Sequence, residues 1–222
     1  GKSHMGALSI TDARILAFPV RSLKGVFAWV TCPAVLQRLQ RDLSLAGFPE
    51  IPETIEVDPD MAYLPEGSPL LVEKNFVLLE EFEFKAKHHP GLKELFDWLP
   101  DQVFSEADQA TRTQAEKRFV ILSNDDFGHF VKHATEVMAR VGLDYETKTV
   151  KQGALFYEEF LPAETLFYSL VLADASRDSD SNFKAQDVMA ELIEHLPAYL
   201  QVGGDATIGK GLCALNLKRG EA

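Results

Sequence analysis

The sequence is short of three things: cysteine, long apolar runs and positive charge. Its 222 residues include two cysteines, Cys32 and Cys213, which lie far apart in the chain. Disulfide-stabilised secreted domains are rich in cysteine, so this content is typical of a reduced, cytoplasmic protein with unlinked thiols. No stretch reaches the ~18 apolar residues of a membrane-spanning helix, and no signal peptide is visible. We therefore expect a cytoplasmic protein that has no membrane partner.

The deficit of positive charge bears on nucleic-acid binding. The chain carries 22 Lys and Arg against 34 Asp and Glu, a net charge of −12. Taken over the whole chain, this argues against a nucleic-acid partner, which usually meets a basic surface. The charge is uneven, however: residues 50–60 and 73–83 are acidic, whereas cations crowd the first fifth of the chain. The net charge therefore does not exclude a local basic groove on an acidic protein.

Apolar patterning predicts alternating groups of strands and helices. Strand-like runs cluster in pairs between well-separated helical patterns, which favours an α+β fold with an antiparallel sheet, ferredoxin-like in topology. We expect one domain over residues 1–222 with insertions at about 48–69 and 86–117. We expect the insertion at 48–69 to be exposed. We expect the insertion at 86–117 to be a short helical segment followed by a polar link. The predicted helices begin at Pro33, Ser123 and Asn182 and end at Gly47, Gly142 and Leu200.

A glycine-rich stretch near the C-terminus, residues 201–212, is the most unusual segment. Gly203, Gly204, Gly209 and Gly211 surround Lys210. Glycines that expose backbone N–H groups, together with a lysine, can cradle phosphate. A nucleotide-binding P-loop needs Ser or Thr after the lysine and runs from a strand into a helix. Here Gly211 follows the lysine, and the loop is expected to run from a helix into a strand. A glycine-rich helix-to-strand turn is therefore favoured over an NTPase loop.

Three further groups of residues are candidates for chemistry. Arg21, Ser22 and Lys24 fall within five residues of a turn and suit phosphate contacts, or form an ordinary solvated turn. Glu158 and Glu159 point to opposite faces of a strand, where a carboxylate can bind a divalent metal or transfer protons, or is simply half exposed. His129 and His133 share a helix face that we expect to be solvated. The segment 151–153, which begins with Lys151, is a plausible hairpin turn between strands at 144–150 and 154–160.

Several stretches together resemble one family. Residues 6–14 and 18–31, which contain Phe-Pro-Val-Arg-Ser-Leu-Lys-Gly, are similar to the backbone subunit of type III-B CRISPR effector complexes, the Cmr complex. The similarity continues through Gly153–Pro162 and the glycine loop, which the wider RAMP superfamily shares. The resemblance therefore spans nearly the whole chain.

The resemblance implies a fold and a function. It implies an RRM-like palm with a β-hairpin thumb, and copies that stack along a guide CRISPR RNA with other effector subunits. Target RNA would be cleaved with a divalent metal, Mg or Mn, in antiviral defence. On this chain it makes Arg21, Ser22 and Lys24 contacts to the guide backbone, residues 203–211 the RAMP glycine loop and Lys151 part of an RNA-facing element. Glu158 or Glu159 would assist the nuclease site.

Residues 1–13 do not match the family's first strand and its loop with a catalytic aspartate. We therefore expect an N-terminal portion to be missing from this chain, and with it the principal catalytic group. Two alternatives to an RNA-binding scaffold remain. One is a metal-dependent endoribonuclease that acts through Glu158, Glu159 or Asp12, and the other is an unrelated acidic interaction protein.

Overall fold

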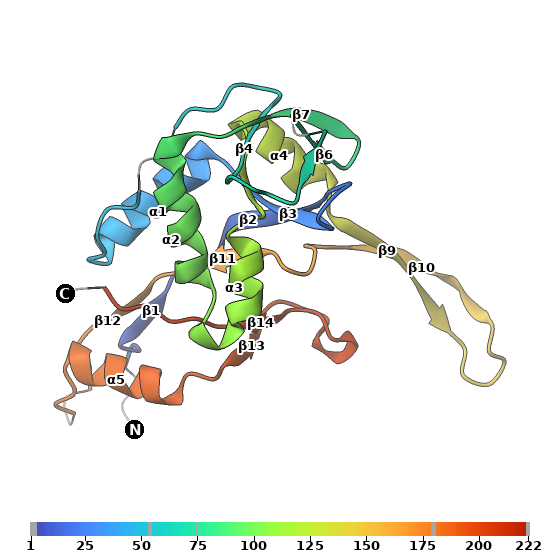
Figure 1. Cartoon of the computed structure of the whole chain (residues 1–222). Coiled ribbons are helices and arrows are strands. Elements are labelled where there is room, and N and C mark those ends of the chain that lie inside the picture. The colour runs from blue at the N-terminus through green and yellow to red at the C-terminus, as the bar shows by residue number, and fades with distance from the viewer. Residues whose placement is uncertain (1–3, 53–54, 74, 179–180, 221–222) are drawn as a thin grey trace.

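A mixed eight-stranded sheet lies at the centre of the structure, a computed structural model that describes residues 4–52, 55–73, 75–178 and 181–220. Its strand order is β11-β2-β3-β8-β4-β7-β6-β5 (Figure 1). The pairs β3–β8 and β4–β7 are parallel and the other neighbouring pairs antiparallel. The strands are β2 (Arg14–Arg21), β3 (Phe27–Thr31), β4 (Met61–Tyr63), β5 (Leu71–Val72), β6 (Phe76–Leu79), β7 (Phe82–Lys87), β8 (Phe119–Ile121) and β11 (Leu166–Tyr168).

The strand β2 shows how the sequence specifies the sheet. Its residues Leu16–Val20 are buried, and their unbroken apolar run matches a strand covered on both faces. Pro19 lacks an N–H group, yet it lies inside the strand opposite Trp29 of β3. This is tolerated because β11 reaches only as far as Ala17 on the other side, so that Pro19 faces no strand there.

The helices are α1 (Pro33–Leu45), α2 (Lys93–Val103), α3 (Gln109–Ala115), α4 (Asn124–His133) and α5 (Ala185–His195), with 3-10 turns η1 (Pro90–Leu92), η2 (Glu106–Asp108) and η3 (Ala206–Ile208). Of these, α1 and α4 contact β2 of the sheet, whereas α5 contacts the strand Val171–Ala173 outside it. Pro33 opens α1 as expected. Ser123 caps α4 because its Oγ accepts a hydrogen bond from the N–H of Asp126 at 3.1 Å. The α+β class is confirmed.

A buried carboxylate ties α1 to the sheet. Asp42 Oδ2 accepts hydrogen bonds from Arg14 Nη1 at 2.6 Å and from the Tyr168 hydroxyl at 2.7 Å. Burial raises the pKa of Asp42, but these hydrogen bonds and the charges of Arg14 and Arg41 outweigh it and leave that pKa below its ordinary value. One side chain therefore joins α1, β2 and β11.

Three expectations from the sequence are wrong. The helix predicted to run to Gly142 ends at His133, and β9 (Glu136–Leu143) follows it. The polar link predicted at 111–116 is largely the helix α3. Within the exposed insertion predicted at 48–69, Met61–Tyr63 forms β4 in the middle of the sheet, with Ala62 fully buried. Residues 53–54 of that insertion lie outside the described residues.

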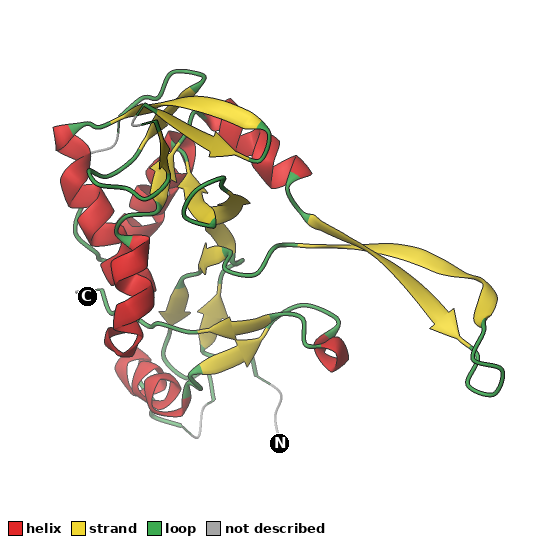
Figure 2. Cartoon of the chain, turned by 45° about the vertical axis from the view of Figure 1, so that its right-hand side comes forward, coloured by secondary structure: helices red, strands yellow, loops and turns green. Residues whose placement is uncertain are grey.

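A two-stranded hairpin projects from the body. The strand β9 pairs antiparallel with β10 (Val150–Phe160), and the pair extends far beyond the rest of the molecule (Figures 1 and 2). This hairpin matches the expected thumb. Two smaller sheets join β1 (Leu8–Ile10) to β12 (Val171–Ala173) and β13 (Tyr199–Gln201) to β14 (Leu212–Ala214).

The described part of the chain bears on two further expectations. Cys32 and Cys213 are free thiols, as expected, and Cys32 is buried. None of the helices in the described ranges has the length and apolar character that a bilayer crossing requires.

Candidate nucleic-acid interface

The loop between β2 and β3 is held in a strained conformation. Gly25 and Val26 both have φ of +75°, which is unusual for a β-branched residue such as Val26. The loop is closed by a hydrogen bond from Ser22 N to Val26 O at 3.0 Å, and Leu23 N donates to Leu78 O at 3.2 Å. A Cβ on Gly25 would lie 2.9 Å from Leu70 Cδ2, so glycine is needed for close packing as well. The strain is therefore maintained by the body of the protein.

The side chains of this loop differ in their exposure to solvent. Lys24 is exposed, as are the apolar side chains of Leu23 and Val26. The Ser22 hydroxyl is buried and has no hydrogen-bond partner among the described residues. A ligand that reached this hydroxyl would satisfy a polar atom that the fold leaves unpaired.

Arg21, at the end of β2, has a fixed carboxylate partner. Its Nε and Nη2 donate to Glu80 Oε1 and Oε2 at 2.9 and 2.8 Å, and this bidentate pair raises the pKa of Arg21. Glu80 is placed by a tight turn between β6 and β7, where its φ is +51° and its N–H donates to Arg21 O at 2.9 Å. The Arg21 side chain is 85% exposed, so its remaining N–H groups face solvent in a fixed orientation.

The glycine-rich loop joins β13 to β14. Its ends meet through a hydrogen bond from Val202 N to Gly211 O at 2.8 Å. Gly211 has φ of +74°, and a Cβ there would overlap the carbonyl oxygen of Val202. Gly203 and Gly209 also have positive φ, whereas a Cβ on Gly204 would meet no atom within 4 Å. The loop contains η3 and runs between strands, and the sequence expectation of a helix directly before it is wrong because Tyr199–Gln201 is a strand.

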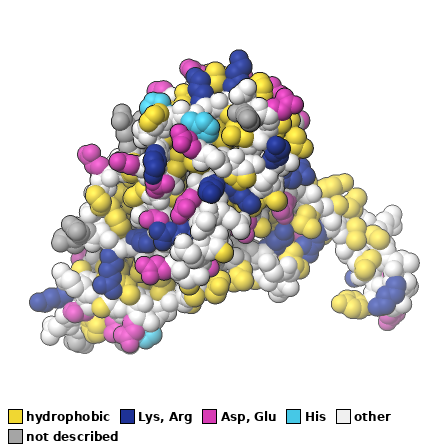
Figure 3. Space-filling model, viewed as in Figure 1, with side chains coloured by type: hydrophobic (Ala, Val, Ile, Leu, Met, Phe, Trp, Pro, Cys, Tyr) yellow, Lys and Arg dark blue, Asp and Glu magenta, His cyan; other side chains and the backbone are white. Residues whose placement is uncertain are grey.

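Lys210 links this loop to the hairpin. Its Nζ lies 3.4 Å from Glu136 Oε2, at the start of β9, and 4.4 Å from the ring centre of Phe160, at the end of β10. Both contacts are at the base of the hairpin, where cationic and acidic side chains interleave (Figure 3). The glycine loop and the hairpin base therefore form one surface.

Lys151 lies elsewhere on the hairpin. The turn comprises residues 144–149, so the predicted turn at 151–153 is wrong. Asp144 Oδ1 caps the true turn by accepting from the N–H groups of Thr147 and Glu146 at 2.9 and 3.0 Å, which lower its pKa. The segment that includes Lys151 is an irregularity in β10, since the register shifts between Val150 and Leu155. Lys151 is exposed near the tip, away from Arg21 and Lys210.

Glu158 and Glu159 occupy opposite faces of β10, as expected for neighbours in a strand. Glu158 Oε2 lies 3.1 Å from Arg140 Nη1, within ion-pair distance although not aligned for a hydrogen bond. Glu159 Oε1 accepts from the Thr135 hydroxyl at 2.6 Å. Asp12, the third acidic candidate, is exposed in the link between β1 and β2.

These carboxylates do not fit a metal centre. No group of three or more His, Cys, Asp or Glu side chains among the described residues is arranged to hold an ion. Glu158 and Glu159 each have a protein partner and face apart. The structure therefore supplies no geometry from which a metal-dependent step can be derived.

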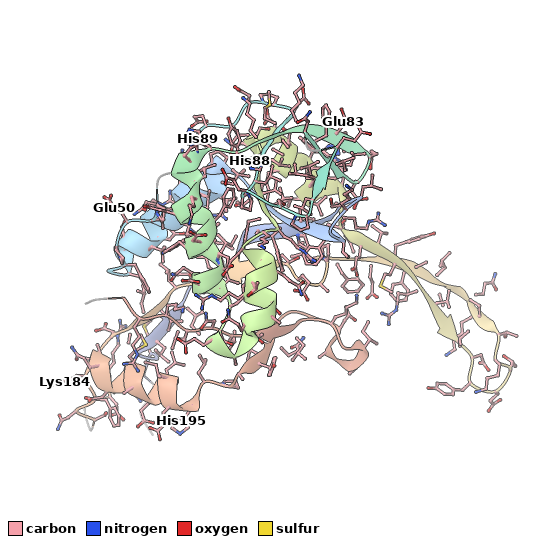
Figure 4. The ribbon with its side chains drawn as sticks, viewed as in Figure 1. Glu50, Glu83, His88, His89, Lys184 and His195 are labelled. Carbon is pink, nitrogen blue, oxygen red and sulfur yellow. The ribbon has the colours of Figure 1, made fainter. Side chains whose placement is uncertain are left out.

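An open cleft lies between the hairpin base and the body. Its volume is about 610 Å³, and its walls come from β2, the β6–β7 turn, α4 and the first residues of β9. We call it the hairpin-base cleft, and its lining includes Arg21, Glu80, Phe82, His129, Glu136 and Pro162. Beyond the cleft, the side chains of β9 and β10 stand free on both sides of the hairpin (Figure 4).

The cleft brings together residues that the sequence did not connect with one another. His129 and His133 are exposed, as predicted, but their rings lie 4.7 Å apart and His129 meets Phe82 edge-on at 4.9 Å. Phe82 and Glu80 come from a turn that is distant from α4 in sequence. The only local signal was the run Glu80-Glu81 between two apolar stretches.

Comparison with known proteins gives a family match and two relatives. The RAMP superfamily profile matches residues 1–214. The chain is 38% identical over 223 residues to the CRISPR system Cmr endoribonuclease Cmr4 of Pyrococcus furiosus, covering 98% of this chain and 72% of that protein. It is 25% identical to the CRISPR system CMR subunit Cmr4 of Saccharolobus solfataricus, covering 93% and 70%.

Solved structures give the same result. The crystal structure of oligomeric Cmr4 from Pyrococcus furiosus matches with a TM-score of 0.73 and 34% identity, covering 93% of this chain and 71% of that one. The type III-B Cmr-beta complex bound to cognate target RNA contains a chain that matches with a TM-score of 0.67. At 17% identity, that likeness shows a shared fold.

Proposed function

Because the chain belongs to the RAMP superfamily, and within it to the backbone subunits of type III-B Cmr complexes, we propose that it binds guide RNA as one of several stacked copies. Family membership removes the alternative of an unrelated acidic protein. The proposed RNA contacts are Arg21 at the end of β2, Ser22 and Lys24 in the β2–β3 loop, Lys210 with Gly203, Gly204, Gly209 and Gly211 in the glycine loop, and Lys151 on the hairpin.

One observation carries the proposal. The glycine loop and the hairpin base are joined by Lys210, and Glu136, which Lys210 contacts, also lines the cleft that holds Arg21. Two segments that are far apart in sequence thus present cations on one side of an acidic molecule. Cations placed this way suit a phosphate backbone that runs past the hairpin.

The partners follow from the relatives. The Pyrococcus protein forms an oligomer and the Cmr-beta complex binds target RNA, so we infer that copies of this chain, other complex subunits and target RNA are its partners. We also infer that the protein works in the cytoplasm, where such RNAs are found.

Native mass spectrometry with single-stranded RNAs of increasing length tests the backbone role. We expect the number of protein copies per RNA to rise in steps as the RNA lengthens. One copy bound regardless of length would contradict stacking, although not RNA binding itself.

Metal-dependent RNA cleavage is the second candidate, because the 38% identical relative is an endoribonuclease. The acidic residues described here do not fit a metal centre, so we assign no cleavage step to Glu158 or Glu159. Incubating the chain and guide-paired target RNA with Mg²⁺ or Mn²⁺ separates the two functions. Cuts that disappear in Glu159→Ala would establish cleavage by this chain.

A further inference from the structure

Two histidines of α4 lie one helical turn apart on the wall of the hairpin-base cleft. His129 and His133 are separated by four positions, so their side chains share a face of the helix, and their ring centres lie 4.7 Å apart. A zinc ion that lies ~2.0–2.1 Å from one nitrogen of each ring can bridge imidazoles at this separation. The helix therefore already brings together two ligands for one ion.

The ring nitrogens of this pair are not engaged by the protein. Both side chains are exposed, and neither has a hydrogen-bond or ion-pair partner among the described residues. His88 and His195, by contrast, each place Nδ1 2.9 Å from a backbone carbonyl oxygen. The ring of His129 is also oriented, because it meets the Phe82 ring edge-on with centres 4.9 Å apart. A neutral imidazole without a partner keeps its lone pair for a metal ion.

The charges around the pair favour a cation. Glu80, Glu81 and Glu136 line the same cleft, and Arg21 is the one Lys or Arg side chain among the described residues of its lining. His133 is the last residue of α4, where the carbonyl groups at the helix end carry partial negative charge. Carboxylates in excess and a helix C-terminus both attract a divalent cation to this part of the cleft.

Two imidazoles also select the kind of metal ion. Imidazole nitrogen suits Zn²⁺, Ni²⁺ and Cu²⁺, whereas Mg²⁺ and Ca²⁺ prefer oxygen ligands. No group of three or more His, Cys, Asp or Glu side chains in the described part of the chain is arranged around an ion, so water fills the remaining positions. Structural zinc sites use four protein ligands. A site with two exchanges its metal with the solution and is not needed for folding.

We propose that His129 and His133 form an exchangeable site for one divalent ion of the zinc class. The site goes beyond the proposed RNA binding and is distinct from Mg²⁺-dependent cleavage, because its ligands are nitrogen atoms of the protein. A bound ion joins the two rings across the last turn of α4, and β9 begins at Glu136, directly after that helix. Zinc therefore stiffens the place where the chain passes from the body into the hairpin.

Calorimetric titration of the chain with zinc chloride, without RNA, tests this proposal. The tightest zinc site of the wild type should be weakened at least tenfold by His129→Ala and by His133→Ala, because loss of even the outer hydrogen-bond partner of a ligand costs ~10–100-fold in affinity. His195→Ala, at the exposed end of α5, is the matched control and should behave as wild type. Excess Mg²⁺ should not displace the zinc.

His133→Cys gives a second, independent variant, since a thiolate is also a zinc ligand and should retain binding that His133→Ala loses. Hydrogen exchange supplies a readout besides affinity: zinc should slow exchange in the last turn of α4 in the wild type and not in His129→Ala. Equal zinc affinity in the wild type and both alanine variants, or displacement by Mg²⁺, would overturn the site. Neither result would bear on RNA binding, because no RNA is present in the titration.

Discussion

Lys210 places its ammonium 4.4 Å from the ring centre of Phe160, so the glycine-rich loop is fastened to the base of the projecting hairpin. A cation over an exposed ring contributes ~0.5–1 kcal/mol. This contact connects the two segments that we assign to RNA binding. Its removal should change the position of the hairpin while the fold of the body is retained.

Lys210→Ala is expected to loosen the hairpin base. Without the contacts to Phe160 and Glu136, amide hydrogen exchange at the start of β9 should accelerate about two- to fivefold, the factor that corresponds to the cation–π contribution. Lys151→Ala, a lysine exposed near the tip of the same hairpin, is the control. Equal exchange in both variants would argue that Lys210 does not hold the hairpin.

Gly211→Ala should distort the glycine loop. The position has φ of +74° and its added Cβ would overlap Val202 O, so the substitution should cost ~1–3 kcal/mol locally. Gly204→Ala is the matched control, because nothing lies within 4 Å of that Cβ. Exchange of the β13 and β14 amides should rise in the first variant only. A normal loop in Gly211→Ala would contradict the described geometry.

Glu80→Gln is expected to strengthen the salt dependence of RNA binding. In the wild type, the Glu80 carboxylate compensates Arg21, so Arg21 acts as less than a full charge towards phosphate. Removing that negative charge should steepen the slope of log K against log salt by up to ~0.7, the value for one added phosphate contact on a single strand. Glu83→Gln, on the neighbouring strand β7, should change it less. An unchanged slope in Glu80→Gln would place Arg21 outside the interface.

Asp42→Asn should lower stability by about 2–3 kcal/mol at neutral pH, because it weakens charge-assisted hydrogen bonds to a buried carboxylate. The pKa of Asp42 is lowered on folding, so its stabilisation is present above the unfolded value of ~3.9 and is lost as pH falls through the lower folded value. Urea unfolding should therefore show the difference from wild type shrinking below pH ~4. A difference that grew on acidification would contradict this assignment. Asp97→Asn, at an exposed position of α2, serves as control.

The sequence predicted those elements whose signals are local. Pro33 marked the start of α1 and Ser123 that of α4, because proline geometry and capping act over a few residues. The apolar run of β2 likewise reflected burial on both faces. The contacts of Arg21, by contrast, depend on the β6–β7 turn that the sheet brings beside it.

The wrong boundaries have a physical cause. Val137, Met138 and Val141 continue the helical spacing of α4, but they lie on a hairpin that exposes apolar side chains on both faces. Helical and two-sided strand patterns are then indistinguishable. Gly142 was taken for a helix end, whereas it allows close approach to Ala154 across the hairpin, where a Cβ would lie 3.1 Å from that residue's Cβ. The strand β4 carried no local signal, since its parallel pairing with β7 arises only in the folded sheet.

The cationic residues of the candidate site could be predicted from the sequence, but the residues that line its cleft could not. Lys24 and Lys210 stand out beside glycines in the sequence. Phe82, His129 and Glu136 come from three elements, and they line one cleft only in the folded protein.

The central claim is that Lys24, Arg21 and Lys210 form a phosphate-binding surface, and the salt dependence of single-stranded RNA binding tests it most directly. We expect log K to fall linearly with log salt, and Lys24→Ala and Lys210→Ala each to reduce the slope by ~0.7. Lys93→Ala, on α2 at the side of the body away from the hairpin, should leave it unchanged (Figure 1). Equal slopes in the wild type and all three variants would contradict the account.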